Sequence, residues 1–243
     1  YIVFDLLDKK KLTWNTKLSV SKNAASQPRS KLYVEEGTFI SVNNAVKALI
    51  IKSANDVATV IAENISGSER EFAKLMTKYA KKIGMKDTTF KNASGLRNRA
   101  QLTTARDIAI LSHALISNFP ENYKLFSEKK FIWKDKVFKT HNHMMLKYKG
   151  ADGIKTGYIL ASGFQLAFSA IRNNKRLIGI YFGGDTAKQR DQSLTFLMNK
   201  EFEELQENYT KKATTTNQKK LYNKFKIVVG TFKYKKNAEK QVK

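Results

Sequence analysis

The feature that most constrains the fold is a change in hydrophobic periodicity near the middle of the chain. Between residues 42 and 118, apolar residues recur every three or four positions, which is typical of amphipathic helices. After Pro120 the apolar residues alternate with polar ones, which is typical of half-buried strands. The sequence therefore predicts an α/β protein of the α+β kind, with a helical cluster followed by a mainly antiparallel sheet.

The expected elements follow from this periodicity and from turn residues. Apolar spacing predicts helices over 1–10, 42–65, 69–83, 103–118 and 188–208, and alternation predicts short strands over 17–20 and 38–42. We expect a hairpin over 131–140 that turns at Asp135-Lys136, and two core strands over 163–173 and 175–184 joined at Asn173-Asn174. Gly84 is the expected helix stop, and Thr103 or Thr104 the expected cap of a helix with Asp107 in its first turn.

The two ends of the chain suggest further expectations. Residues 1–10 have a helical stripe with no preceding cap, so we expect the downstream end of a helix that begins earlier, with the first strands of the sheet also missing. Residues 209–220 are polar and of low complexity, which predicts a linker between a domain over 1–208 and a strand-plus-helix fragment over 221–243. The apolar opening YIVFDLL has no basic lead-in and no cleavage site, so we expect any secretion leader to belong to the missing upstream part.

The charge balance limits the classes of partner. The chain has 45 basic and 21 acidic residues, a net charge of +24, and no cysteine, which excludes disulfides, thiolate nucleophiles and Cys-ligated zinc. Most of the cations are lysines, which act as point charges rather than as the planar forks that read bases, so we expect an anionic surface such as a bacterial envelope and no nucleic acid. His141 and His143 have no acidic residue at ligand spacing, so no metal and no cofactor is predicted.

The sharpest short motif is Lys155-Thr156-Gly157, within DGIKTGYILASGF. We expect it to open a strand that follows a glycine-containing turn. A lysine there can hold a cation toward a cleft, the threonine hydroxyl can bond an anionic group, and the glycine lets a substrate backbone approach the strand edge. An ordinary Lys-Thr-Gly turn is the alternative interpretation.

A second motif, Ser-x-Asn, occurs three times, at Ser21/Asn23, Ser41/Asn43 and Ser53/Asn55. Only the last copy lies within an apolar helical stretch, ALIIKSANDVATVIA, where buried polar groups need partners. Ser53 and Asn55 are therefore the informative copy, and Asp56 is expected to cap the following segment.

Five strings in fixed order carry a family resemblance: KSAND at 52–56, KNASGL at 91–96, TTARD at 103–107, DGIKTGY at 152–158 and IGIYFGGDT at 178–186. Together they resemble the serine D-alanyl-D-alanine carboxypeptidases, which are low-molecular-weight penicillin-binding proteins of peptidase family S11, over roughly residues 1–200. The resemblance implies a β-lactamase/transpeptidase-like fold and a periplasmic or envelope enzyme that removes the terminal D-Ala from peptidoglycan pentapeptide stems through an acyl-enzyme. It also implies binding of β-lactam antibiotics by the complete protein.

The resemblance assigns roles to individual residues. Ser53 would relay protons, and Asn55 would orient the substrate amide. Lys155 would supply positive potential for the substrate carboxylate, which Thr156 would also bond. Gly157 belongs to the same motif, the N–H of Tyr158 would be one oxyanion donor, and Arg190 would bind the terminal carboxylate. Ser53 and Lys155 are expected to face each other across a cleft.

The family's first motif, Ser-x-x-Lys, is where this sequence departs from the pattern. Two strings fit it, Ser19-x-x-Lys22 and Ser127-x-x-Lys130, and neither stands at the expected helix start or in the expected order. We expect the nucleophile and its lysine about two turns before Tyr1 by the ~3.6-residue helical repeat, and hence no activity from these 243 residues alone.

Other functions stay open. Residues 221–243 resemble the front of a SPOR module, which binds peptidoglycan stripped of its peptides, so a non-catalytic wall-binding protein is one alternative. A class A β-lactamase would need a glutamate on a loop between the second and third motifs, whereas NASGL and TTARD occupy that interval here. A basic nucleic-acid binder would show strongly salt-dependent retention on DNA.

Overall fold

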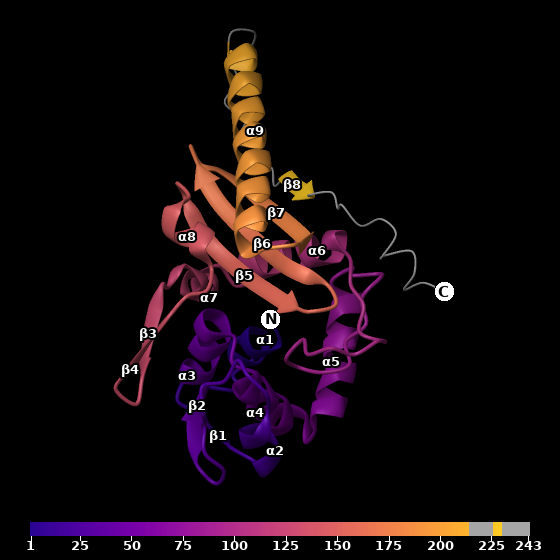
Figure 1. Ribbon diagram of the computed structural model, residues 1–243, viewed down its shortest axis with the longest axis vertical. Coiled ribbons are helices and arrows are strands. Elements are labelled where there is room, and N and C mark those ends of the chain that lie inside the picture. Colours follow the sequence, from indigo (N-terminus) through magenta and orange to yellow (C-terminus); the bar gives the residue numbers. More distant parts are fainter. Residues whose placement is uncertain (214–225, 230–243) are drawn as a thin grey trace. The chain divides into compact units, whose positions relative to one another are not determined.

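The structure is a computed structural model that describes residues 1–213 and 226–229, with side chains for residues 1–206. Its contacts divide the chain into two compact units, Tyr1–His141 and Asn142–Lys243. Figure 1 shows helices dominating the first unit and a sheet with one long helix dominating the second. The predicted change from helices to strands is therefore confirmed, and the protein is of the α+β kind.

Helices and two short hairpins make up the first unit. The helices are α1 (Ile2–Asp8), α2 (Lys22–Ser26), α3 (Val42–Lys47), the π-helical turn η1 (Ala48–Lys52), α4 (Asn55–Ser66), α5 (Glu69–Lys82), α6 (Ala105–Asn118), α7 (Pro120–Tyr123) and the 3₁₀ turn η2 (Lys124–Ser127). The hairpins are antiparallel: β1 (Lys17–Ser19) pairs with β2 (Phe39–Ser41), and β3 (Lys130–Trp133) pairs with β4 (Lys136–Lys139).

Side-chain caps and glycines explain where the helices begin and end. The Thr104 hydroxyl accepts the N–H of Asp107 at the start of α6, and the Ser68 hydroxyl accepts the N–H of Glu71 at the start of α5. After α5 the chain reverses at Gly84, whose φ of +97° is open to glycine at little cost. These boundaries confirm the predicted stop and the second of the two predicted caps.

Two local predictions needed correction. Residues 42–65 do not form one helix, because η1 ends at Lys52, the next residue Ser53 has a φ of +58°, and α4 starts at Asn55. The β3–β4 turn lies one residue earlier than expected: Lys134 and Asp135 are the two turn residues with positive φ, and Lys136 already belongs to β4. A two-residue turn with both φ values positive matches strand twist, and aspartate tolerates that region well.

The second unit is built on a four-stranded sheet in the order β5-β6-β7-β8. Its strands are β5 (Ala151–Ile159), β6 (Gly163–Arg172), β7 (Lys175–Gly184) and β8 (Lys226–Val229), and its helices are α8 (His143–Lys147) and α9 (Ala187–Ala213). The pairs β5–β6 and β6–β7 are antiparallel, whereas β8 runs parallel to β7. The predicted core strands and their Asn173-Asn174 turn are confirmed.

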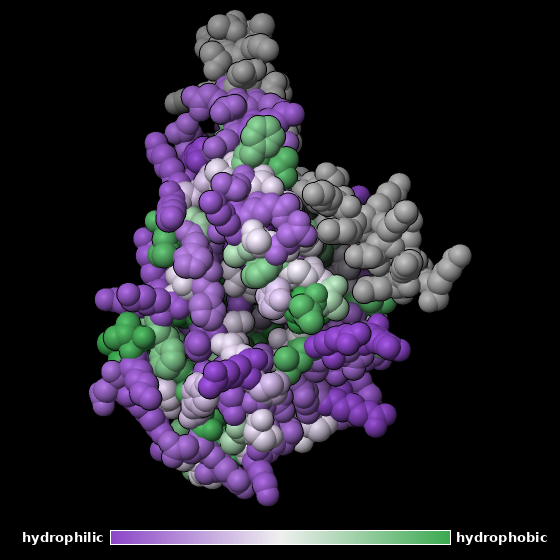
Figure 2. All heavy atoms as spheres, viewed as in Figure 1, coloured by the Kyte–Doolittle hydropathy of each residue, from purple (hydrophilic) through white to green (hydrophobic). Residues whose placement is uncertain are grey.

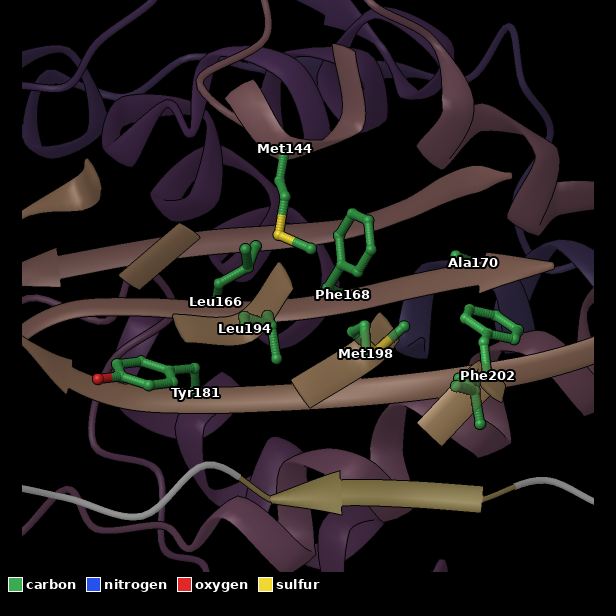
Figure 3. Close-up of a cluster of buried hydrophobic side chains, with 9 residues drawn as sticks. Met144, Leu166, Phe168, Ala170, Tyr181, Leu194, Met198 and Phe202 are labelled. Atoms are coloured by element: carbon green, nitrogen blue, oxygen red, sulfur yellow. The ribbon is translucent and has the colours of Figure 1, made fainter. Parts of the chain in front are cut away.

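A cluster of buried side chains joins α9 to the sheet (Figure 3). Leu166, Phe168 and Ala170 alternate along β6 and point toward α9, which contributes Leu194 and Met198. A Cβ at Gly179 of β7 would lie 2.8 Å from Met198 Sδ, so this glycine provides room for the helix. Burying large apolar side chains in this way is the main favourable contribution to folding of this unit.

The C-terminal expectations have mixed outcomes. The helix expected over 188–208 runs to Ala213, so its last turn extends into the predicted linker. The expected strand in 221–243 exists as β8, which lies in the same sheet as β7. The remainder of the linker and of the SPOR-like segment lies outside the described residues. Within the described residues, the helices are too short or too polar to cross a bilayer.

Candidate functional site

The Ser53 segment is a sharp turn between η1 and α4. Ser53 is left-handed, with φ +58° and ψ +46°, and the Ala54 N–H reaches back to the Ala48 carbonyl at 3.4 Å. Such a conformation is costly for a residue with a Cβ and persists only where surrounding contacts enforce it. Strained turns and π-helical turns of this kind are enriched at functional sites.

Residues 28–34 supply the contacts that enforce the turn. The Ser30 hydroxyl donates to the Lys52 carbonyl at 3.0 Å, and the Asn55 N–H donates to the Ser30 carbonyl at 2.8 Å. The Asn55 side-chain nitrogen donates to the Pro28 carbonyl at 3.1 Å. This leaves the Asn55 amide oxygen as the atom of that side chain suited to accept a bond from a substrate N–H.

Asp56 is the largest contributor to this bracing, and its extent was not evident from the sequence. Its carboxylate is fully buried and accepts the N–H groups of Leu32, Tyr33 and Val34 at 2.8–3.2 Å. It also accepts the N–H of Val57 at 2.9 Å in the first turn of α4. The predicted capping role needs correction, because the N-cap residue of α4 is Ala54 and Asp56 lies inside the first turn. Its carboxylate instead fastens a segment 22–24 residues away.

The strings NASGL and TTARD also form bracing contacts. Asp107 is buried and accepts the Asp87 N–H at 2.8 Å and the Thr88 hydroxyl at 2.5 Å. Asn92 accepts the Gly95 N–H, and the Gln101 amide oxygen accepts the Asn92 N–H. These side chains hold the loop before α6 in one conformation.

The Lys-Thr-Gly segment lies in the middle of β5, not at its start as predicted. The strand begins at Ala151, and the register pairs Lys155 with Ala167, Thr156 with Leu166 and Gly157 with Gln165. Alternation therefore places Lys155 and Gly157 on one face of the sheet and Thr156 on the face that packs on α9. Within the described sheet β5 is an edge strand, so side chains of both faces border the same edge.

Lys155 is electrostatically unusual. Loss of hydration lowers the pKa of its ammonium from 10.5 to about 8, and its Nζ donates to the Thr156 carbonyl at 2.9 Å. A pKa of about 8 keeps the side chain mostly charged at neutral pH. The group therefore offers a poorly hydrated cation, which attracts a carboxylate more strongly than a fully hydrated one.

Gly157 and Tyr158 continue the strand. A Cβ at Gly157 would meet the Gln165 side chain at 3.5 Å, an ordinary contact, and the backbone is not left-handed. The fold of this unit therefore does not itself demand glycine there. Tyr158 is exposed, and its ring packs on Phe164 with 4.4 Å between ring centroids.

Arg190, the predicted carboxylate ligand, is buried near the start of α9. Its Nε and one terminal nitrogen donate to Asp191 Oδ1 at 2.9 and 2.7 Å, and the other terminal nitrogen donates to the Gln165 carbonyl at 3.1 Å. These bonds join α9 to β6 beside Gly157. The described geometry thus gives Arg190 a bracing contact, and its binding of a substrate carboxylate stays a prediction.

A strut at the start of β5 was missed from the sequence. One terminal nitrogen of Arg176 donates to Asp152 Oδ2 and to the Ser169 hydroxyl, both at 2.6 Å. The three residues come from β7, β5 and β6, so they fix the three strands against one another. Asp152, the aspartate of DGIKTG, could have suggested such a contact from the sequence. Nothing in the sequence indicated that its partner is Arg176, 24 residues later.

The fold and these motifs define the class of penicillin-binding, transpeptidase-like proteins. Residues 1–186 match the family model of the D-alanyl-D-alanine carboxypeptidases, peptidase family S11, and the chain belongs to this family. The carboxypeptidase DacD of Escherichia coli K12 is 33% identical over 205 residues, which cover 82% of this chain and 53% of DacD. The chain spans about half the length of the curated relatives it matches.

Solved structures agree with this assignment. The carboxypeptidase DacD of Francisella tularensis superposes with a TM-score of 0.79 at 29% identity, covering 82% of this chain and 61% of that one. Penicillin-binding protein D2 of Listeria monocytogenes, in its cefotaxime-bound form, superposes with a TM-score of 0.72 at 29% identity, covering 81% and 82%. The predicted family and fold class are confirmed.

Proposed function

We propose that this chain is the larger part of the catalytic domain of a serine D-alanyl-D-alanine carboxypeptidase that trims peptidoglycan stem pentapeptides. Family membership over residues 1–186 is the observation that carries the proposal. Two features of this chain support it: a braced, strained turn at Ser53 and a poorly hydrated Lys155 on an edge strand. The proposed setting is the bacterial periplasm or envelope, where such a substrate lies.

The roles proposed for the residues follow from their chemistry. The Ser53 hydroxyl relays a proton, and the amide oxygen of Asn55 accepts the substrate N–H. The Lys155 ammonium and the Thr156 hydroxyl bind the substrate carboxylate along the edge of β5, with Arg190 as a further cation. The N–H of Tyr158 stabilises the oxyanion.

The attacking serine and its lysine are proposed to lie outside these 243 residues. Ser19 is the last residue of β1 and donates to Asn64, and Lys22 starts a separate helix. Ser127 is the last residue of η2, and Lys130 starts β3. Neither pair stands on one turn of a helix, which the Ser-x-x-Lys motif requires to bring its lysine to its serine.

The direct test is labelling with a fluorescent penicillin. We expect the longer product that includes an upstream Ser-x-x-Lys to acylate, and the 243-residue chain not to. In the longer product, Ser53→Ala and Lys155→Ala should each lower the acylation rate by about 100-fold or more. Normal acylation of either variant would remove that residue from the proposed roles.

Gly157→Ala is a sharper variant, because its Cβ makes only an ordinary contact at 3.5 Å within the fold. We expect it to unfold at the same urea concentration as the unmodified protein and yet to acylate more slowly, since the added methyl group borders the edge where the substrate backbone lies. Unchanged acylation would show that substrate does not lie along this edge. A longer product that never acylates but sediments with peptidoglycan would favour the non-catalytic wall-binding alternative.

A further inference from the structure

The β3–β4 hairpin carries a surface that the proposed carboxypeptidase chemistry does not use. Two cross-strand pairs, Lys130 with Lys139 and Ile132 with Val137, share one face, and we call these four residues the outer hairpin face. All four are exposed; Ile132 retains 64% and Val137 55% of their accessible surface. Figure 2 shows hydrophobic atoms over this hairpin bordered by hydrophilic ones.

The opposite face of the hairpin fixes this orientation. Phe131 is buried and stacks on Phe138 with 5.4 Å between ring centroids, and the Lys52 ammonium lies 5.9 Å from the Phe138 ring. A one-residue slip of the strand register would expose these rings and bury the lysines. The outer hairpin face is therefore held outward by the packing behind it.

In water this face is doubly unfavourable. Lysines directly opposite each other on neighbouring strands repel, and exposed β-branched side chains leave apolar surface in water. The acids beside the hairpin do not neutralise the pair: Glu35 bonds Lys134 at 2.8 Å, and Glu128 bonds Lys47 at 3.0 Å. Asp135, the remaining acid of the hairpin, is in the turn at the far end from Lys130 and Lys139.

We propose that the outer hairpin face binds the surface of an anionic phospholipid bilayer. Ile132 and Val137 enter the boundary between headgroups and acyl chains, while Lys130 and Lys139 extend their ammonium groups to lipid phosphates. One surface thereby relieves both the repulsion and the apolar exposure. A second copy of the chain fits less well, because it would bring the two lysine pairs together.

The test is co-sedimentation of the 243-residue chain with vesicles of phosphatidylcholine alone or with 30% phosphatidylglycerol. We expect binding to the anionic vesicles only, and a loss of affinity of about fivefold or more in the double variant Ile132→Ser/Val137→Ser. Lys130→Gln/Lys139→Gln should lose a similar factor at 0.1 M salt, and the difference should shrink as salt rises. All four positions are exposed, so these variants should fold, which circular dichroism checks.

Matched controls separate this surface from the general positive charge, since residues 211–243 alone hold 11 lysines. Leu160→Ser/Phe196→Ser removes apolar side chains that are even more exposed, and Lys22→Gln/Lys86→Gln removes charge at two exposed positions. Both should change the affinity by less than about twofold. Controls that weaken binding as much as the outer-face variants would overturn the proposal, as would equal binding to neutral vesicles.

A tryptophan on the outer hairpin face gives a readout specific to the hairpin. The chain has two tryptophans, and Trp133 lies on the opposite face of the hairpin, so Trp14→Phe/Trp133→Phe/Ile132→Trp leaves a single tryptophan on the outer hairpin face. We expect bromine-labelled lipid in anionic vesicles to quench its fluorescence, and the further change Val137→Ser to weaken the quenching. Unquenched fluorescence in bound protein would overturn the proposal. Binding of lipid-free polyaspartate that depends equally on Ile132 and Val137 would identify an acidic protein as the partner instead.

Discussion

Asp56 illustrates how one buried charge can shape a site without touching substrate. Its two oxygens accept four backbone N–H groups, three of them from the segment that lies under the Ser53 turn. A carboxylate has no proton to donate and suits a site that offers only donors. An asparagine at this position would replace one of the two acceptor oxygens with an NH₂ group, which would face backbone N–H donors and could not accept their bonds.

Asp56→Asn is therefore expected to destabilise the protein by about 1.5–3 kcal/mol, the range for a lost hydrogen bond to a charged group. Urea unfolding followed by circular dichroism measures this. The control is Asp87→Asn, whose side chain is exposed and which should stay within about 0.5 kcal/mol of the unmodified protein. Equal midpoints for the two variants would contradict the bracing role.

Lys155 predicts a pH dependence. Because burial lowers the folded-state pKa to about 8 from 10.5, the unfolded chain binds more protons between these values. The contribution of Lys155 to stability therefore rises as the pH increases from about 8 to 10.5, and below pH 8 the cost of burying the charge is fully present. Lys155→Met should remove this dependence.

The measurement is NMR of the protein with its lysines reductively methylated with ¹³C. One methyl resonance should titrate near pH 8, apart from the other lysines, and should vanish in Lys155→Met. Lys188→Met, in which an exposed lysine is removed, should leave that resonance in place. A protein in which every lysine titrates near its usual pKa would refute the assignment.

Among the elements, the entry to β5 depends on a glycine that no other residue can replace. Gly150 has a φ of +82°, and a Cβ there would lie 2.0 Å from the Ile171 carbonyl oxygen. Because that atom belongs to the backbone of β6, it cannot move without breaking the pairing of the strands. Gly37 has nearly the same φ, +76°, but a Cβ there would have no other atom within 4 Å.

Comparing alanine substitutions at Gly37 and Gly150 separates the effect of the steric contact from that of the left-handed backbone. Gly37→Ala should cost about 1 kcal/mol, the strain of the left-handed region, whereas Gly150→Ala should cost at least about 2 kcal/mol more because overpacking adds to it. Differential urea unfolding of the two variants measures the difference. Equal losses would mean that β6 yields to the added methyl group.

Most elements could be predicted from the sequence, because local chemistry determines them. The Thr104 cap, the stop at Gly84 and the Asn173-Asn174 turn depend on residues adjacent in the chain. The break at Ser53 and the central position of Lys155 in β5 could not be placed precisely, because tertiary contacts decide them. Apolar periodicity alone reveals neither a strained turn nor the extra length that a strand gains by pairing with its neighbour.

At the scale of the molecule, the motifs of the candidate site were evident, but their supports were not. Ser53, Asn55 and Lys155 stand in recognisable strings, whereas the Asp152–Arg176 contact of the strut and the Asp56 contacts join residues far apart in sequence. Pairings of that range leave no trace in a single sequence. The proposed cooperation of Ser53 with Lys155, 102 positions later (155 − 53), is of the same kind and stays a prediction.

The parallel pairing of β8 with β7 makes a prediction for the whole chain. Val228→Pro removes a backbone N–H from β8 without changing the net charge of +24. We expect this variant to form concentration-dependent dimers or larger species in analytical ultracentrifugation, because the uncovered strand can recruit another chain. Lys224→Gln, which alters charge but no backbone donor, should sediment like the unmodified protein.

β8 pairs with residues Leu177–Ile180 of β7, which are mostly aliphatic. Without β8, the backbone N–H and C=O groups on that side of β7 could pair with a strand of another molecule. The four residues of β8 occupy these groups, so we expect them to keep β7 from pairing with a second molecule. A protein shortened after α9 would lack β8, and we expect it to self-associate more readily.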